Sequence, residues 1–495
     1  MGRGPRRRAG VLRDTWHLLG DGQLWISVLG GPRAFHAHEP LAFALTAWAV
    51  PAGPPGQVAF RAELWSVALG VLAVFFMLRI AARAGADPRE AWFALGLLVA
   101  SGTLQFGFGY IEAYPVLWVA GLAYLWAGLR TAAGAPAWPA SLLLGLGFGV
   151  HGTMALFGVS WLWLMRDQTW RTRIVNALVG LVPVALAYVV LPALVGGAAH
   201  TEESSKGVKD ILNQLSVYPH GVGSYILAQT NRWTLAAPLA LPILILGWRQ
   251  VRARPTSAFC ALAAAGMMLF PLLVDTDGSR GAALDWDNFS TAGPALAAAA
   301  ALAAAGLVAT RAAHTARSLA LALALFGTFS FVGVNATPRA ALDRFQSLMG
   351  APEWTGHTRA LASETLAAAY RDRNDWPNAA AWYIRAAREE PGNHRAVRNA
   401  ASAALRVGRN REAANLYLDL APVQSGDPRL WFYLGTALEG VASVDSALVA
   451  YREAVRLDPG YAEAYGALAG LLERVGSPEA LEEAARMRTR MPANR

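Results

Sequence analysis

The chain has 495 residues, 55% of them hydrophobic and 16% charged, and its formal net charge at pH 7 is +9. From residue 354 onward there are 18 basic and 17 acidic residues, whereas the part before it holds 25 basic and 17 acidic ones. Positive charge in short loops between apolar stretches is typical of membrane topology, which argues against a nucleic-acid partner. The lone Cys260 excludes a metal site built on thiolates.

Apolar stretches of about 17 to 20 residues predict membrane spans. They lie at 64–81, 91–108, 114–130, 174–195, 233–248, 257–274, 291–310 and 318–334. The stretch 138–164 is too long for one span and is interrupted at His151-Gly152, so we expect two short helices that form a hairpin. The predicted membrane domain covers 63–335, after an N-terminal outer-face segment over 1–62.

Arginine placement orients the predicted spans. Eleven arginines lie in the alternate loops 83–90, 130–137, 165–173, 249–254 and 311–317, which marks these loops as cytoplasmic. The other segments are 1–62, 109–113, 196–232, 275–290 and the apex at His151, and they hold the candidate acidic residues, although 1–62 also carries arginines that would favour the cytoplasm. We therefore expect a multi-pass inner-membrane protein whose C-terminal region lies on the outer, periplasmic side.

The N-terminal outer segment contains Gly20-Asp21-Gly22 and, further on, Glu39-Pro40. An Asp between two glycines is often only a turn. Asp21 also precedes the apolar helices on the acidic face, where a carboxylate can act as a general base on an acceptor hydroxyl. Both interpretations stay open for Asp21.

Two further outer-face residues are candidates for chemistry. Glu112 occupies a tight turn between two predicted spans, where an ionisable group is costly and indicates function. The alternative for Glu112 is an interfacial carboxylate flanked by Tyr110 and Tyr114. His151 at the hairpin apex is placed to bind a phosphate or hydroxyl, or else it is a structural histidine.

The outer loop 196–232 carries the only two lysines of the chain, Lys206 and Lys209, beside 41 arginines. The loop is predicted to be an amphipathic segment at the membrane interface. Lys209, His220 or Arg232 would then be a cation for a lipid phosphate. Alternatively, the lysines extend toward anionic headgroups without a specific ligand.

The outer loop 275–290 brings four carboxylates and Arg280 within thirteen residues. Carboxylate oxygens are suitable ligands for a divalent cation that also contacts a phosphate, although the spacing matches no known metal loop. Asp275 and Asp277 fit a solvated acidic loop, while Asp285 and Asp287 flank Trp286 at the mouth of a predicted span. A divalent metal ion is therefore the one cofactor considered, with no assigned ligands.

The region after residue 354 repeats every 34 residues: Pro391 and Pro459 are 68 residues apart, which is twice that period. The copy that ends at Pro459 contains Trp431, Leu434, Gly435, Leu438, Ala447, Tyr451 and Ala454. It resembles the tetratricopeptide repeat (TPR) consensus except at Leu438, where Tyr is usual. Three repeats and a partial fourth predict a TPR domain over 354–495, behind a linker over 336–353, with a groove for a protein partner.

The predicted fold class is therefore all-α, with a polytopic transmembrane helix bundle of about ten helices followed by a TPR α-solenoid. This layout, with Gly20-Asp21-Gly22 in the first outer loop and acidic residues in later ones, resembles the GT-C superfamily of membrane glycosyltransferases. It is closest in layout to the protein O-mannosyltransferase group. The resemblance covers most of the chain by architecture, but only Asp21 by a short motif. The family has a span before that Asp, and this sequence shows none.

The resemblance implies transfer of a sugar from a lipid-linked donor, a polyprenyl phosphate, to a hydroxyl acceptor on the outer face. Asp21 would accept the hydroxyl proton during attack on the anomeric carbon, with inversion. A cation from Lys209, His220, Arg232 or Arg280 would stabilise the leaving lipid phosphate. The residues Glu39, Glu112, His151, Asp285 and Asp287 would position the acceptor or the sugar.

Two alternatives remain. An enzyme of the O-antigen ligase or polymerase type would carry its chemistry in a long outer loop between late spans, so that Asp21 would be dispensable. A membrane-anchored TPR scaffold without catalysis would carry its acidic turns only as topology signals.

Overall fold

The computed structural model describes residues 16–18, 22–31, 39–84, 87–195, 221–273, 290–304, 311–350 and 354–492. The chain divides into two compact units, Met1–Leu348 and Met349–Arg495. Within the described ranges every regular element is a helix, and none is a strand. The all-α fold class is therefore confirmed.

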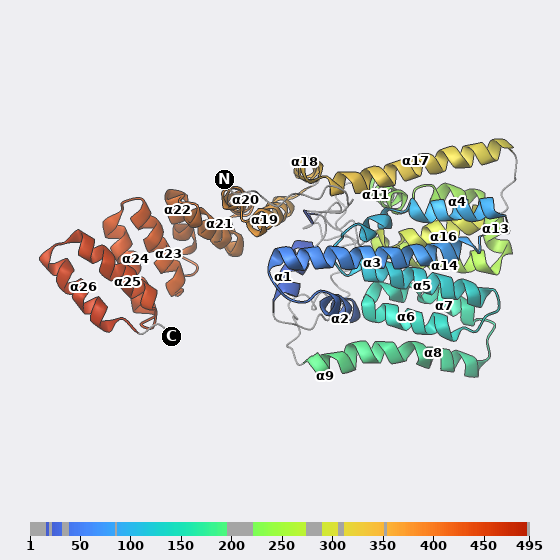
Figure 1. Ribbon diagram of the computed structural model, residues 1–495, viewed down its shortest axis with the longest axis horizontal. Coiled ribbons are helices and arrows are strands. Elements are labelled where there is room, and N and C mark those ends of the chain that lie inside the picture. Colours follow the sequence, from blue (N-terminus) through green and yellow to red (C-terminus); the bar gives the residue numbers. More distant parts are fainter. Residues whose placement is uncertain are drawn as a thin grey trace. The chain divides into compact units, whose positions relative to one another are not determined.

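The first unit is a bundle whose longest helices run side by side, with α8 and α17 at opposite edges (Figure 1). Its helices up to the first long gap are α1 (Gly22–Gly30), α2 (Pro40–Ala49), α3 (Pro55–Ala81), α4 (Pro88–Val99), η1 (Gly102–Gly107), α5 (Tyr114–Ala132), α6 (Trp138–Val150), η2 (Gly152–Phe157), α7 (Gly158–Met165), α8 (Trp170–Ala185), η3 (Leu186–Val190) and α9 (Leu191–Val195). After that gap follow α11 (Gly221–Ala236), α12 (Ala240–Leu246), α13 (Trp248–Ala253), α14 (Pro255–Leu273), α16 (Gly293–Ala304), α17 (Arg311–Ala336) and α18 (Pro338–Leu348).

Three helical stretches of the described chain are long and apolar enough to cross a membrane: Pro55–Ala81, Trp170–Ala193 and His314–Ala336. They correspond to the predicted spans 64–81, 174–195 and 318–334. The prediction of about ten membrane helices is wrong for the described residues, among which only these three stretches combine the length and the hydropathy of a span.

The other predicted spans fail for physical reasons that differ from case to case. The stretch 91–108 ends its α-helix at Val99 and continues as the tighter turns of η1. The stretch 233–248 is interrupted after Ala236, where Leu239 takes a left-handed backbone conformation. The helix α16 is buried in protein along its whole length, so its apolar alanines pack against α4, α12 and α14 rather than against lipid.

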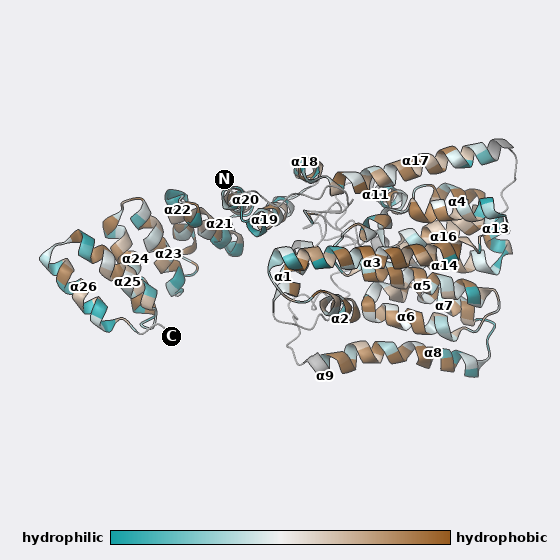
Figure 2. Cartoon of the chain, viewed as in Figure 1, coloured by the Kyte–Doolittle hydropathy of each residue, from teal (hydrophilic) through white to brown (hydrophobic). Residues whose placement is uncertain are grey.

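The two edge helices present apolar side chains outward. Exposed residues of α8 include Ile174, Val175, Leu178, Leu181 and Val182. Figure 2 shows the hydrophobic colour along the helices of the first unit and more hydrophilic colour on those of the second. Since soluble surfaces seldom carry large contiguous apolar areas, the outer faces of α8 and α17 fit contact with lipid.

The predicted linker 336–353 contains α18, an amphipathic helix that belongs to the first unit. Its residues Ala341 and Phe345 are buried, while Arg339, Asp343 and Gln346 are not. The helix follows α17 after the single residue Thr337, so the end of the last apolar helix is tied directly to it.

The second unit consists of helix pairs, which are α19 (Gly356–Asp372) with α20 (Trp376–Glu389), α21 (His394–Arg406) with α22 (Asn410–Leu420), α23 (Pro428–Gly440) with α24 (Val444–Leu457), and α25 (Ala462–Val475) with α26 (Pro478–Arg490). Each helix packs against the next in the chain, as expected for a solenoid. The copy over α21 and α22 is degenerate in sequence but forms the same helix pair as its neighbours. The second unit is therefore TPR-like, with four pairs.

The turn inside each pair explains the regular period. Asn374, Gly408, Ala442 and Gly476 all have positive φ, between 60° and 76°, and each lies 34 residues after the one before. A left-handed residue after a helix redirects the chain and satisfies terminal carbonyls. The bond from Asp375 N to Tyr370 O, 2.9 Å long, recurs from Arg409 to Ala404 and from Ser443 to Leu438.

Ala442 is the one alanine among these four turn residues. Its Cβ makes the left-handed conformation unfavourable by about 1–2 kcal/mol. Glycine removes that cost, but its larger unfolded-state entropy cancels part of the gain. We expect Ala442→Gly to raise the free energy of unfolding of the second unit by about 0.5–1 kcal/mol. Amide hydrogen exchange of α23 and α24 in the full chain measures this change in stability. The reciprocal change Gly408→Ala should destabilise the pair α21 and α22. A lower stability of Ala442→Gly would refute this account of the turn.

Candidate functional site

Carboxylates and histidines gather at the end of the first unit where α2, α5 and η2 begin. Glu39 stands at the N-cap of α2, directly before Pro40, and its Oε1 lies 3.4 Å from His151 Nε2. Both side chains are largely buried. The structure thus brings together two residues that are 112 positions apart and that the sequence analysis proposed separately.

The orientation of His151 follows from the break between α6 and η2. The helix α6 ends at Val150, and His151 continues in extended conformation before the first turn of η2. Its Nδ1 accepts the backbone N–H of Thr153 at 3.2 Å. Because that nitrogen is an acceptor, the ring proton sits on Nε2, which points at the Glu39 carboxylate. The break at His151-Gly152 was predicted from the sequence, and the structure confirms it.

The turn over 109–113 holds Glu112, which is 6% exposed. Ser66 on α3 fixes the start of this turn: its hydroxyl donates to Phe106 O at 2.5 Å and accepts from Gly109 N at 3.1 Å. Gly109 has a φ of 86°, which glycine adopts readily. Tyr114, at the start of α5, has its ring centroid 5.7 Å from that of His151, with the two rings tilted by 39°. The turn that carries Glu112 therefore lies beside the Glu39–His151 pair.

A second buried pair was missed by the sequence analysis. His17 Nε2 lies 3.3 Å from Glu63 Oε1, and His17 is 3% exposed. Glu63 sits on α3, one residue before the predicted span 64–81. A carboxylate inside a long apolar helix indicates function or pairing by default, and that pattern could have identified Glu63. We call Glu39, Glu63, Glu112, His17 and His151 the acid–histidine cluster.

Gly22 joins the two sides of the acid–histidine cluster. A Cβ placed on Gly22 would lie 2.9 Å from His17 Cβ and 3.4 Å from Ile111 O. The first residue of α1 is thus packed between the segment of His17 and the turn of Glu112. Any larger residue at this position would push them apart.

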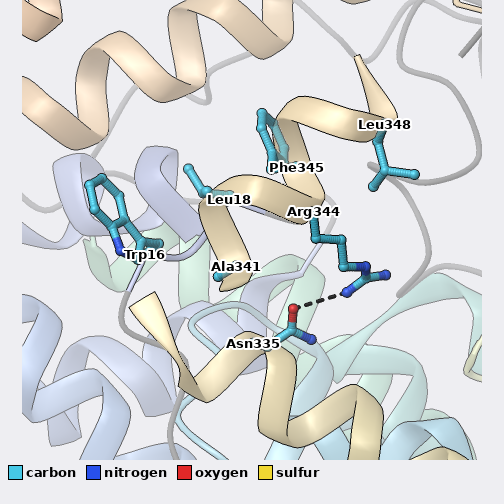
Figure 3. A pocket seen from close by; sticks show the side chains of 7 residues that line it. All are labelled: Trp16, Leu18, Asn335, Ala341, Arg344, Phe345 and Leu348. Atoms are coloured by element: carbon cyan, nitrogen blue, oxygen red, sulfur yellow. Dashed lines mark hydrogen bonds between the residues drawn. The ribbon is translucent and has the colours of Figure 1, made fainter. Parts of the chain in front are cut away.

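The segment of His17 is anchored by α18 (Figure 3). Trp16 and Leu18, the neighbours of His17, line a small pocket together with Ala341, Phe345 and Leu348. Arg344 closes the pocket by donating from Nη1 to Asn335 Oδ1 at 3.0 Å. His17 itself has a φ of 50°, a conformation that costs a non-glycine residue about 1–3 kcal/mol. The packing of its two neighbours on α18 helps to maintain that conformation.

Of the other predicted site residues, Arg232 is the one that lies within the described ranges. Arg232 lies half-buried on α11, one turn before Ala236, whose carbonyl accepts from Ser101 Oγ at 2.8 Å. Within the described residues no three His, Cys, Asp or Glu side chains gather closely enough to hold a metal ion. The predicted residues Asp21, Lys209, His220, Arg280, Asp285 and Asp287 lie outside the described ranges.

The TPR-like unit presents a second functional surface. Ion pairs connect the first helices of successive pairs: Arg395 Nη2 lies 2.7 Å from Glu364 Oε2, and Arg398 Nη2 lies 3.3 Å from Asp427 Oδ2. Beside them Tyr461 packs on Phe432, with ring centroids 5.1 Å apart. Burial, followed by the neighbouring Tyr433, raises the pKa of Tyr461 to about 12, so its phenol stays a hydrogen-bond donor at neutral pH. Stacked helix pairs of this type form a protein–protein interaction region.

Comparison with known proteins gives only partial likenesses. No protein-family model matches the chain, and no curated protein matches it. Among solved structures, "MamA 41-end from Desulfovibrio magneticus RS-1" is 19% identical, covers 31% of this chain and 83% of its own, and has a TM-score of 0.26. BtubC from P. vanneervenii is 16% identical, covers 37% of this chain and 90% of its own, and has a TM-score of 0.24. The TPR-like description of the second unit rests on its own helix pairs and 34-residue period.

Proposed function

We propose that the first unit transfers a sugar from a polyprenyl-phosphate carrier to a hydroxyl acceptor, and that the TPR-like unit recruits a protein substrate or partner of this reaction. The observation that carries the proposal is the acid–histidine cluster. It collects three carboxylates and two histidines at one end of an apolar bundle, where burial of such groups is costly unless they are paired or functional.

In the proposed mechanism Asp21 takes the proton of the acceptor hydroxyl. The hydroxyl oxygen forms a bond to the anomeric carbon with inversion, and the bond from that carbon to the carrier phosphate breaks. The phosphate leaves with the electron pair and is stabilised by a cation from Lys209, His220, Arg232 or Arg280. Glu39, held by His151, and Glu112 orient the hydroxyls of acceptor and sugar, while Asp285 and Asp287 border the same outer face.

The proposed orientation follows the arginine loops. The acid–histidine cluster and the TPR-like unit would both face the outer, periplasmic side of the inner membrane. A lipid-linked donor presented there would meet an acceptor held by the TPR-like unit on the same side.

A non-catalytic scaffold is the second candidate, because the Glu39–His151 and His17–Glu63 pairs are closed contacts that also serve stability alone. In that case the first unit anchors the TPR-like unit and makes no product. An enzyme of the O-antigen ligase or polymerase type would make a product without needing Glu39.

Mass spectrometry of surface proteins, lipids and glycans separates these functions. We expect a hexose-type mass to disappear in a deletion strain and to fall at least tenfold in Glu39→Gln, since misplacement of a reacting group can cost about 10²-fold in rate. Glu479→Gln, the same change at an exposed residue of α26, should match wild type at equal expression. Loss of the hexose-type mass in the deletion strain alone would refute the assignment of Glu39. If neither strain loses this mass, the non-catalytic scaffold is the remaining function.

A further inference from the structure

A second pocket lies at the opposite end of the first unit, between the N-terminal ends of α4 and α17 and the C-terminal end of α16. Its volume is about 420 Å³. The chain runs from this end along α4 and η1 to the turn of Glu112, so the pocket is separate from the acid–histidine cluster. It lies at the first turns of α4 and α17, which fall within the stretches 83–90 and 311–317 that were predicted as cytoplasmic loops.

Two arginines give the lining its charge. Arg89 comes from α4 and Arg317 from α17, and the lining also includes His314. Glu90 is the one carboxylate among the lining residues, so the formal charge of the lining is positive. Arg317 places its guanidinium carbon 5.9 Å from the centre of the Phe93 ring. A guanidinium matches the oxygens of a phosphate through paired hydrogen bonds.

Apart from Ser318 the rest of the lining is apolar, and the pocket lies at the start of His314–Ala336, which is long and apolar enough to cross a membrane. Leu321 forms part of the wall, and Trp92, 69% exposed, stands at the rim. Along α17 the exposed residues Leu319, Leu323 and Phe326 follow at spacings of four and three, on the face of the helix opposite to the lining residues Arg317 and Leu321. Tryptophan at such a rim is typical of the membrane–water interface.

We propose that this arginine pocket binds the phosphate of an anionic membrane lipid, whose acyl chains contact the apolar part of the lining. A soluble phosphate would use the two arginines but would gain nothing from the apolar side chains of Trp92, Phe93 and Leu321, which is why the lipid is the better occupant. The lipid bridges α4 and α17 at the point where Leu321 packs against Gly96. This proposal concerns a different site from the sugar transfer and does not depend on it.

Native mass spectrometry of the purified full chain in detergent tests the arginine pocket. The chain is titrated with phosphatidylglycerol, with phosphatidylcholine and, separately, with phosphatidylglycerol in the presence of inorganic phosphate. We expect the anionic lipid to bind about tenfold or more tightly than the zwitterionic one, and Arg89→Gln/Arg317→Gln to remove that preference. Millimolar inorganic phosphate should leave the bound lipid in place.

The matched control is Arg249→Gln/Arg252→Gln, which removes the same charge from exposed positions of α13 at the same end of the unit. This control should change lipid affinity by less than about twofold. Equal weakening in both double variants would overturn the pocket in favour of diffuse surface charge, and displacement by inorganic phosphate would overturn the lipid as occupant. If the double glutamine variant does not fold, Arg317→Lys keeps the charge but loses the paired geometry, and unchanged lipid preference there would contradict the proposal.

Discussion

Asp21→Asn is expected to lower the rate of sugar transfer by about 10²–10⁴-fold, while the amount of folded protein in the membrane stays at the wild-type level. Asparagine has nearly the same size as aspartate but cannot accept the acceptor's proton. The expectation rests on the proposed transfer reaction and on the position of Gly22, the next residue in the chain, between His17 and Ile111. The rate is measured as the hexose-type mass that appears on the acceptor over time.

Asp14→Asn is the matched control for this change. It removes the same charge from the same N-terminal segment, seven positions earlier, and should leave the rate within about twofold of wild type. If both variants keep full activity, the base lies elsewhere, and an enzyme of the O-antigen ligase type is favoured. If both lose activity equally, the segment acts through its net charge rather than through a base at Asp21.

Sequence periodicity was sufficient to predict the helix pairs of the second unit, because each repeat is a local structure. The positions of Gly435, Tyr451 and Pro459 relative to one another depend only on helices and turns within 34 residues. The degenerate copy over α21 and α22 retains Ala413 and Tyr417 of the consensus but has Val397 and Ala400 where the next copy has Trp431 and Leu434. Its turn residue Gly408 nevertheless keeps the 34-residue spacing of left-handed positions. That spacing is visible in the sequence only after the conformation is known.

Hydropathy alone was insufficient to predict which helices of the first unit span a membrane, because an apolar stretch is equally compatible with lipid and with a protein interior. The alanines of α16 read as a span but lie wholly inside the bundle. The opposite error concerns Glu63, which lies inside the long helix α3 and is nearly buried, yet was placed just outside a predicted span. Contacts such as His17–Glu63 and His151–Glu39 join distant segments, so no local pattern specifies them.

The candidate site is therefore only partly visible in the sequence. Glu39, Glu112 and His151 were selected by their expected place on the outer face, and the structure adds that they lie around one turn, next to Tyr114. The contribution of α18 was not foreseen at all, because the stretch 336–353 reads as a linker. In the structure this helix packs against the residues on either side of His17, which belongs to the acid–histidine cluster. The same helix directly precedes the TPR-like unit in the chain.

Phe345→Ala is expected to release α18 from the first unit. Phe345 is 1% exposed, and truncation of a buried Phe costs about 3–5 kcal/mol. That loss is comparable to the stability of a single docked helix, so α18 should open locally rather than unfold the bundle. Hydrogen exchange of the full chain in detergent should show much faster exchange over 338–348, with α3 and α5 unchanged.

The same variant should disturb His17, because Trp16 and Leu18 lose the surface that maintains its positive φ. We expect faster exchange over 16–18 and, if the proposed transfer is correct, a fall in its rate with little change in the amount of folded protein. Gln346→Ala on the exposed face of α18 is the control and should match wild type in both measurements. Faster exchange in α18 with 16–18 unaffected would show that His17 is held by Glu63 alone. In that case α18 would be a tether for the TPR-like unit without influence on the acid–histidine cluster.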